Sequence, residues 1–267
     1  DADFAFVYQR NQTLYLCRDY LGVKPLFYEF DSQTNTFKFS SEKKALSTHS
    51  QELSPREIIS YSMKTYTLKS LKKEHLKLCE ESDGEYDSMQ DTTFQLLKEA
   101  VQKRVPTSKN KTVGLLFSGG VDSTVIALML KQLGVEFVCY GAELVSSQLE
   151  EAEDAKYSKQ IAQDYNLELK MATITVDELE ELIIETMRII ETSDYIKVSV
   201  ALPFLAACRL ASKDRVDIMF SGLGSEEIFA GYRRHKQAEN VNQECLNGLH
   251  LLHKRDLYRD DVITMSQ

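Results

Sequence analysis

The sequence predicts an α/β fold, in which a parallel sheet is covered by helices on both faces, preceded by a smaller β-rich region. From residue 113 onward, short apolar runs of strand length alternate with longer segments of helical length. Before that, over residues 1–40, short aromatic runs separated by turn residues indicate an antiparallel meander. In a parallel sheet, ligands bind at the carboxyl ends of the strands, so the turns that follow the strands are the first places to look for a site.

Length and composition bound the classes of function. A chain of 267 residues with 43% hydrophobic residues suits one large or two medium globular domains. The net charge of −9 disfavours nucleic acid as a partner, and an apolar run near twenty residues is missing, so no membrane span is expected. Five widely spaced cysteines indicate reduced thiols and a cytoplasmic protein. No signal peptide is visible. Because the first residue is not Met and the chain stops without an ending signal, we expect a fragment.

The β-rich region and its connection occupy the first third of the chain. The expected strands are 4–8, 14–17, 26–30 and 37–39. Ser54-Pro55-Arg56-Glu57 has the serine cap, first-position proline and third-position glutamate of a helix start. We therefore predict one domain over residues 1–61, a Lys- and Glu-rich connection over 62–86, and a second domain over 87–267.

The second domain is expected to alternate strands and helices. Helices are predicted at 87–105, from Asp122 past Leu130, at 150–165, from an Asp177 cap to about 190, and at 199–211. Strands are predicted at 113–117, 135–140, 167–175 and 216–220, with a connection over 141–147.

The first notable turn, SGGVDS, follows the strand at 113–117. Its glycines and the helix start behind them favour an anion, and the hydroxyls of Ser118 and Ser123 suit phosphate. The Asp122 carboxylate would repel phosphate alone, and makes sense with a Mg²⁺ between them. Neither G-x-x-x-x-G-K-[ST] nor G-x-G-x-x-G is present. The plain alternative is a glycine-rich strand-to-helix connection with no ligand.

A second glycine turn, SGLGSEEIFAGY over Ser221–Tyr232, follows the last predicted strand. Glu226 and Glu227 stand at a helix start, where carboxylates are favoured, so two capping glutamates are the plain alternative here. If Glu226 shares a Mg²⁺ with Asp122, the two turns must lie on adjacent strand ends. Glu227 is expected to point about 100° around the helix and to matter little.

These motifs resemble a known family. SGGVDS resembles the pyrophosphate loop of the ATP pyrophosphatases, which cleave ATP between the α and β phosphates. SGLGSEEIFAGY is similar to the S-G-E-G-S-D-E-x-F-G-G-Y of asparagine synthetases, and the early segments FAFVY, RDYLGVKPLFY and SSEKKAL resemble the end of their glutaminase domain. Gly231–His235 resembles both archaeal-type synthetases and the relatives that contain an asparagine synthetase domain. The resemblance implies a sheet like that of the adenine nucleotide α hydrolases, preceded by the C-terminal part of an N-terminal-nucleophile glutaminase sandwich.

The resemblance also implies the site residues. The implied ATP-binding residues are Leu116, Ser118, Gly119, Gly120, Asp122, Ser123, Tyr140, Ser221 and Gly222. Asp122 and Glu226 are the implied catalytic and metal-binding residues. Asp1 matches the aspartate that holds the amino group of glutamine, with a frayed terminus as the alternative. One residue departs from the pattern: Leu223 stands where the family has a glutamate thought to act on the acyl-adenylate and ammonia.

The activity implied by the resemblance is that of an ATP-dependent amide-forming ligase. It would make asparagine from aspartate or a related acid and ammonia derived from glutamine, through an acyl-adenylate, with ATP and Mg²⁺ as cofactors. Nucleic acid and membrane are not expected as partners, and a homodimer is one candidate assembly. Because of Leu223, two alternatives stay open: another adenylating ligase of this fold, such as a β-lactam-synthetase-like enzyme, or a non-catalytic relative.

Overall fold

The computed structural model describes the chain except for residues 1, 79–85, 109 and 147–151. The chain divides into two compact units. Unit 1 comprises Asp1–Leu78, Ile189–Thr192 and Gly224–Met265, and unit 2 comprises Cys79–Arg188, Ser193–Leu223 and Ser266–Gln267. The predicted second domain, 87–267, differs from this division at residues 189–192 and 224–265, and the predicted boundaries stay a prediction.

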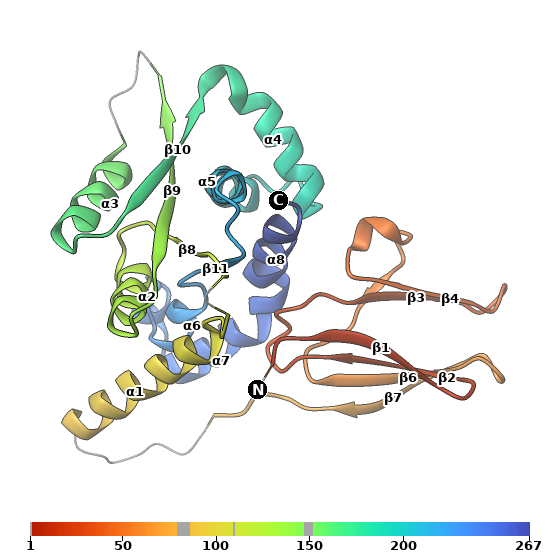
Figure 1. The fold of residues 1–267 in the computed structure, drawn as a ribbon. Coiled ribbons are helices and arrows are strands. Elements are labelled where there is room, and N and C mark those ends of the chain that lie inside the picture. The colour runs from red at the N-terminus through yellow and green to blue at the C-terminus, as the bar shows by residue number, and fades with distance from the viewer. Residues whose placement is uncertain (1, 79–85, 109, 147–151) are drawn as a thin grey trace. The chain divides into compact units, whose positions relative to one another are not determined.

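Unit 1 contains two antiparallel sheets, with strand orders β1-β2-β6-β7 and β4-β3-β5 (Figure 1). The strands are β1 Ala5–Arg10, β2 Thr13–Arg18, β3 Phe27–Asp31, β4 Thr36–Ser40, β5 Gln51–Glu52, β6 Glu57–Ser62 and β7 Thr67–Lys73, with a short 3₁₀ turn η1 at Lys43–Ala45. Leu16, Leu26, Leu53 and Ile59 form a buried cluster, and partly buried side chains from both sheets pack against it. This apolar core holds the two sheets together.

The four strands predicted before residue 40 are present, but they belong to two sheets instead of one meander. The loop between β2 and β3 makes the change of sheet. There the buried Asp19 carboxylate accepts hydrogen bonds from the backbone N–H groups of four successive residues, Leu21, Gly22, Val23 and Lys24. These bonds fix a tight turn, so the chain leaves the first sheet and enters the second.

The predicted helix start at Ser54 is wrong, because the chain continues as strand β6. The Ser54 N–H does donate to Glu57 Oε2 at 3.3 Å, which is one of the two bonds of a capping box. However, Arg56 has a φ of 60°, outside the helical region, and the β-branched Ile58 and Ile59 that follow favour a strand. Strand β7 also occupies part of the predicted connection.

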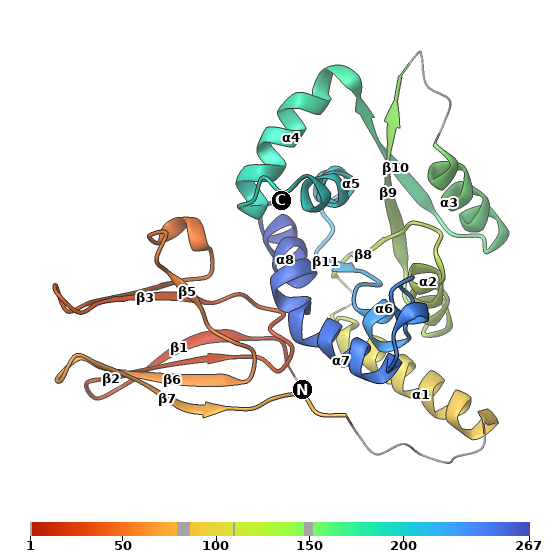
Figure 2. The same cartoon turned by 180° about the vertical axis from the view of Figure 1, so that it is seen from behind.

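Unit 2 has the predicted parallel sheet, of order β10-β9-β8-β11, with helices on both faces (Figures 1 and 2). Its strands are β8 Val113–Leu116, β9 Phe137–Val145, β10 Leu169–Thr175 and β11 Ile218–Phe220, and its helices are α1 Tyr86–Arg104, α2 Val121–Gln132, α3 Glu153–Asp164, α4 Val176–Ile190 (whose last two residues count with unit 1) and α5 Tyr195–Lys213. Helices α1, α2 and α3 bury side chains against one face and α5 against the other. The predicted fold class is confirmed.

Three local predictions in unit 2 differ from the structure. Strand β9 continues to Val145, through the predicted connection, because it pairs with β10 along that length. Helix α4 is capped by Thr175, whose N–H and hydroxyl exchange hydrogen bonds with Glu178, and not by Asp177. Helix α5 begins earlier than predicted, because the Asp194 carboxylate accepts two N–H groups of its first turn.

The last elements of the chain belong to unit 1. They are α6 Ser225–Ile228, the 3₁₀ turn η2 His235–Gln237, α7 Val241–Leu252, the π-helical turn η3 His253–Leu257 and α8 Tyr258–Met265. Within the described residues, α5 of unit 2 is the one helix long and apolar enough to cross a membrane by length and composition. This is weak evidence, since core helices pass the same test, and several side chains of α5 are themselves buried.

Candidate functional site

The first glycine turn joins β8 to α2 and leaves the start of that helix without a side-chain cap. Gly120 is the cap residue, and its own N–H donates to Ser118 Oγ at 3.3 Å. The hydroxyls of Ser123 and Thr124 donate backward to the carbonyls of Gly120 and Gly119 at 3.2 Å each. The N–H groups at a helix start carry a partial positive charge, so this turn can receive an anion.

Gly119 is required where it stands, for two reasons. Its φ of 75° lies in the left-handed region, which side chains rarely adopt. A Cβ at this position would also lie 2.8 Å from the Ser158 α-carbon and 3.3 Å from the Tyr157 ring. The turn therefore rests directly on helix α3, which fixes its backbone before any ligand arrives.

The second glycine turn meets the first at the same edge of the sheet. Strands β11 and β8 pair in parallel, with Phe220 opposite Leu115, so both turns leave the sheet from adjacent strand ends. A Cβ at Gly222 would lie only 2.8 Å from the Asp122 Cβ and 3.2 Å from the Ser123 backbone N. The close approach explains the glycine, and it confirms the prediction that the two turns are neighbours.

The Asp122 carboxylate lies half-buried in the first turn of α2. In the part of the chain that the structure describes, it forms no hydrogen bond or ion pair. A carboxylate near the anion-receiving N–H groups, with no cation beside it, has the oxygen chemistry that Mg²⁺ prefers. The residue present at this position therefore fits a magnesium ion held together with phosphate oxygens.

Leu116 of β8 and Tyr140 of β9 are paired on neighbouring strands, on the face of the sheet that α5 covers. The Tyr140 side chain is buried, and its hydroxyl donates to Asp214 Oδ2 at 2.9 Å. Burial is the largest cause that raises the pKa of Tyr140 above its usual range, and the hydrogen bond to Asp214 is the next largest. The structure thus gives both residues packing roles, and their predicted contact with ATP stays a prediction.

The second motif continues into unit 1, where α6 carries two adjacent glutamates of different character. The Glu226 side chain is half-buried. Burial is the largest cause that raises the pKa of Tyr232, and the neighbouring Glu226 carboxylate raises it further. Glu227 is fully buried and ion-paired with Arg255. The sequence did not predict the ion pair between Glu227 and Arg255. Glu227 therefore has a structural role beyond that of a helix-capping residue.

Two predicted roles stay predictions. Asp122 belongs to unit 2 and Glu226 to unit 1, so the structure leaves the predicted shared Mg²⁺ untested. Asp1 lies outside the described residues, as does its predicted contact with glutamine. Among the described residues, there is no group of three or more His, Cys, Asp or Glu able to hold a metal ion. A Mg²⁺ bound through one or two carboxylates and substrate phosphates needs no such group.

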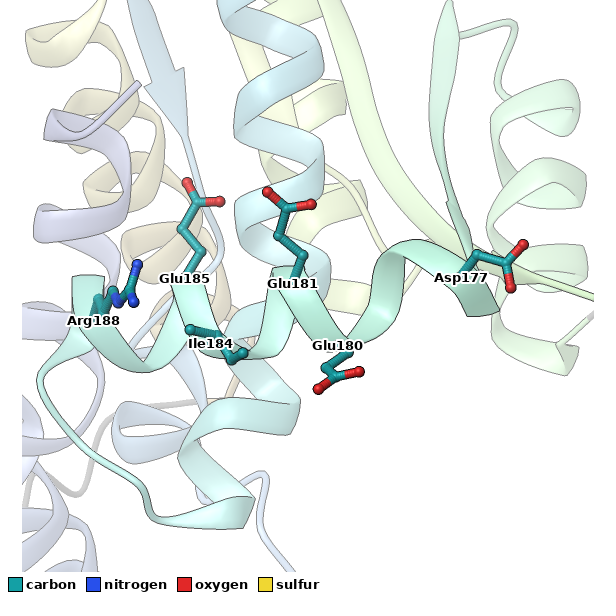
Figure 3. A pocket seen from close by; sticks show the side chains of 6 residues that line it. All are labelled: Asp177, Glu180, Glu181, Ile184, Glu185 and Arg188. Atoms are coloured by element: carbon teal, nitrogen blue, oxygen red, sulfur yellow. The ribbon is translucent and has the colours of Figure 1, made fainter.

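A separate cavity of about 480 Å³ lies along α4 (Figure 3). Its lining comes from that helix alone: Asp177, Glu180, Glu181, Ile184, Glu185 and Arg188. Glu185 is ion-paired with Arg209 of α5. The lining includes none of the predicted site residues, and an acidic row on one helix face is typical of a solvated surface. The glycine turns remain the candidate site.

Comparison with known proteins places both motifs in one family. The family model described as asparagine synthase matches residues 93–265, and that of a glutamine amidotransferase domain matches residues 1–96. The chain belongs to the asparagine synthase family. The predicted resemblance is thereby confirmed, and the two matches meet close to the predicted connection.

Individual relatives agree with this assignment. The chain is 31% identical over its full length to a Methanocaldococcus jannaschii protein provisionally named as a glutamine-hydrolysing asparagine synthetase, covering 52% of that protein. It is 26% identical to asparagine synthetase B of Escherichia coli, over 96% of this chain and 48% of that protein. The chain thus spans about half the length of the curated relatives it matches. A solved NH3-dependent NAD synthetase from Campylobacter jejuni superposes with a TM-score of 0.31 at 20% identity, covering 46% of this chain and 48% of its own.

Two parts of the site could not be found from the sequence. Ser158 and Tyr157 of α3 support the first turn at Gly119. The sequence shows only that position 119 is a glycine, and its positive φ and its contact with α3 are visible only in the structure. Arg255 pairs with Glu227 from η3, and no spacing rule connects residues so far apart in the chain. The pattern of the asparagine synthase family predicted residues within the two glycine turns, but it did not predict the residues of α3 and η3 that pack against or pair with them.

Proposed function

We propose that this chain is part of an ATP-dependent ligase that makes asparagine from aspartate and ammonia derived from glutamine. The observation that carries the proposal is the approach of Gly222 to Asp122, which brings two nucleotide-binding motifs of the asparagine synthase family to one sheet edge. Membership of the family supports the choice of substrates. We extend the proposal to a cytoplasmic location and, as one assembly, a homodimer.

The reaction consists of two substitutions that balance. A carboxylate oxygen of aspartate attacks the α-phosphorus of ATP, the bond to the bridging oxygen breaks, and pyrophosphate leaves with that electron pair. Ammonia then attacks the acyl carbon, the C–O bond breaks, AMP leaves with that electron pair, and the nitrogen loses one proton to become the amide NH2. The uncapped N–H groups at the start of α2 would stabilise the departing pyrophosphate.

Mg²⁺ would be held by Asp122 and, in this proposal, by Glu226, and it would supply charge neutralisation at the phosphates. Ser118 lies exposed at the turn and can donate its hydroxyl to a phosphate oxygen. The glycines on both sides leave the backbone open to a close approach. Positioning and preorganised donors then provide most of the rate enhancement that this chain can contribute.

Leu223 favours a second candidate, an adenylating amide-forming ligase with another acid as substrate, similar to a β-lactam synthetase. This half-buried side chain stands where the family pattern has a glutamate. A leucine can neither accept a proton from ammonia nor stabilise the cation that forms when ammonia attacks. Proton removal would then fall to another group or to a different amine substrate.

A substrate screen tests both candidates. The natural gene product that contains this chain is assayed for pyrophosphate release with ATP, Mg²⁺ and each of a set of carboxylic acids, with glutamine or ammonium as nitrogen donor. Release that depends on aspartate and yields asparagine supports the first proposal. Release with another acid alone supports the second, and no release with any acid, despite ATP binding, indicates a non-catalytic relative.

A further inference from the structure

The two ends of the first glycine turn pack against different parts of unit 2. At the later end, the Asp122 side chain meets the backbone of Gly222. At the earlier end, Gly119 lies against helix α3, where a Cβ on the glycine would be 2.8 Å from the Ser158 α-carbon and 3.3 Å from Tyr157 Cδ1. A ligand on this turn therefore has the predicted metal ligand on one side and the Tyr157 ring on the other.

Tyr157 contacts the turn without being part of the core. Helix α3 turns small side chains inward, and Ala155, Ser158 and Ala162 are the buried ones. The Tyr157 ring touches Gly119 at one edge, but 55% of the side chain is exposed. Its hydroxyl forms no hydrogen bond within the part of the chain that the structure describes. Tyr157 therefore has apolar ring surface beside the glycine turn that the protein itself leaves uncovered.

A cavity of about 540 Å³ lies beside this ring, a volume within the range of small-molecule sites. Its lining comes from the early part of α3: Glu153, Asp154, Lys156, Tyr157 and Gln160. Unlike the cavity along α4, it includes a residue that contacts the candidate site. Two carboxylates face one ammonium group here, so the electrostatic balance favours an uncharged part of a ligand over a phosphate.

We propose that the Tyr157 ring stacks on the nucleoside of ATP and is a specificity-determining residue outside both glycine motifs. This inference rests on the proposed function, which assigns the phosphates and Mg²⁺ to the N–H groups of α2 and to Asp122. The nucleoside end of ATP is uncharged and presents a flat base, and aromatic side chains bind bases by stacking. Tyr140 cannot do this with its ring, because it is buried under α5 on the other face of the sheet.

The test is calorimetry with the natural gene product that contains this chain, with ATP, AMP and pyrophosphate as separate probes in the presence of Mg²⁺. Tyr157→Ala removes the ring, so the affinities for ATP and AMP should fall by about tenfold, while that for pyrophosphate stays unchanged. Tyr157→Phe keeps the ring and should bind all three probes as the unaltered protein does. Tyr165→Ala is the matched control, at a tyrosine that is 44% exposed and lies at the opposite end of the same helix.

The outcomes separate this inference from the proposed function. Unchanged ATP and AMP affinities in Tyr157→Ala overturn the stacking role, while the proposed function stands. An equal fall in pyrophosphate affinity means that Tyr157 only supports the turn, and a fall in ATP affinity in Tyr157→Phe means that the hydroxyl makes the contact. Both results also overturn the stacking role. If the unaltered protein binds neither ATP nor pyrophosphate, the proposed function fails together with the inference.

Discussion

The backbone of Gly222 packs against the side chain of Asp122, so that a Cβ on the glycine would lie 2.8 Å from the Cβ of the aspartate. The two residues come from different turns, which β8 and β11 bring side by side through parallel pairing. This contact leaves room for hydrogen at Gly222 and for nothing larger. It therefore links the conformation of one glycine turn to that of the other.

Gly222→Ala should abolish pyrophosphate release, because the added methyl group displaces Asp122 from its place in the turn. Overpacking of this kind typically costs about 1–3 kcal/mol of stability. Urea unfolding and a pyrophosphate assay measure both effects. Gly134→Ala is the control: its φ of 69° is strained for alanine, by about 1–2 kcal/mol, but a Cβ there meets no atom within 4 Å. Full activity in Gly222→Ala would show that the contact is unimportant for the site.

Asp122→Asn should abolish pyrophosphate release while the melting temperature stays within a degree or two of the original. The substitution keeps the shape and removes the charge, and the carboxylate has no ion-pair partner among the described residues that would be lost. Asp177→Asn, on the exposed acidic face of α4, serves as the control for a lost negative charge. Unaltered activity of Asp122→Asn at saturating Mg²⁺ would rule out a metal-binding role for this residue.

Glu227→Ala should destabilise the protein by about 1.5–3 kcal/mol, because it removes the charged hydrogen bond to Arg255, whose guanidinium is partly exposed and keeps its ion pair with Asp256. Chemical unfolding of purified protein gives the change in the free energy of unfolding. The adjacent Ile228 is 60% exposed, so Ile228→Ala should cost little and provides the comparison within the same helix. Equal stability of the two variants would mean that the ion pair contributes nothing.

The stability of unit 1 should fall on acidification through His253. Burial, with the nearby Arg18 and Lys254, lowers the pKa of His253 from its ordinary 6.5 to about 3. The unfolded chain therefore takes up this proton first, and the stability present above pH 6.5 is lost progressively as the pH falls toward 3. Burial raises the pKa of Asp260 to about 6, which works in the opposite direction.

His253→Gln removes the histidine contribution and leaves that of Asp260 in place. The free energy of unfolding, measured from about pH 7.5 to about pH 4, should therefore decline more steeply with falling pH in the original protein than in the variant. Parallel pH profiles of the two proteins would contradict the assignment. The difference between them isolates one proton, since every other group titrates in both.

The local elements were largely predictable from the sequence, because the signals that specify them are local. An apolar run of strand length, followed by glycines and a second apolar run of helical length, predicted β8, the turn at Ser118 and α2. The misassigned start of β6 shows the limit of such signals. There a serine, a proline and a glutamate matched a helix start, and pairing with β2 decided for a strand.

By itself the sequence determined the strand–turn–helix units and their glycine turns. Through the family motifs, it also identified the candidate site residues within these turns. The tertiary structure alone decided that Gly222 packs on Asp122, that Gly119 rests on Ser158, and that Glu227 pairs with Arg255. Apolar periodicity and turn chemistry depend on residues a few positions apart, so they can be read along the chain. Burial and ion pairing depend on which distant elements the fold brings together, and that exists only once the sheet and its helices have packed.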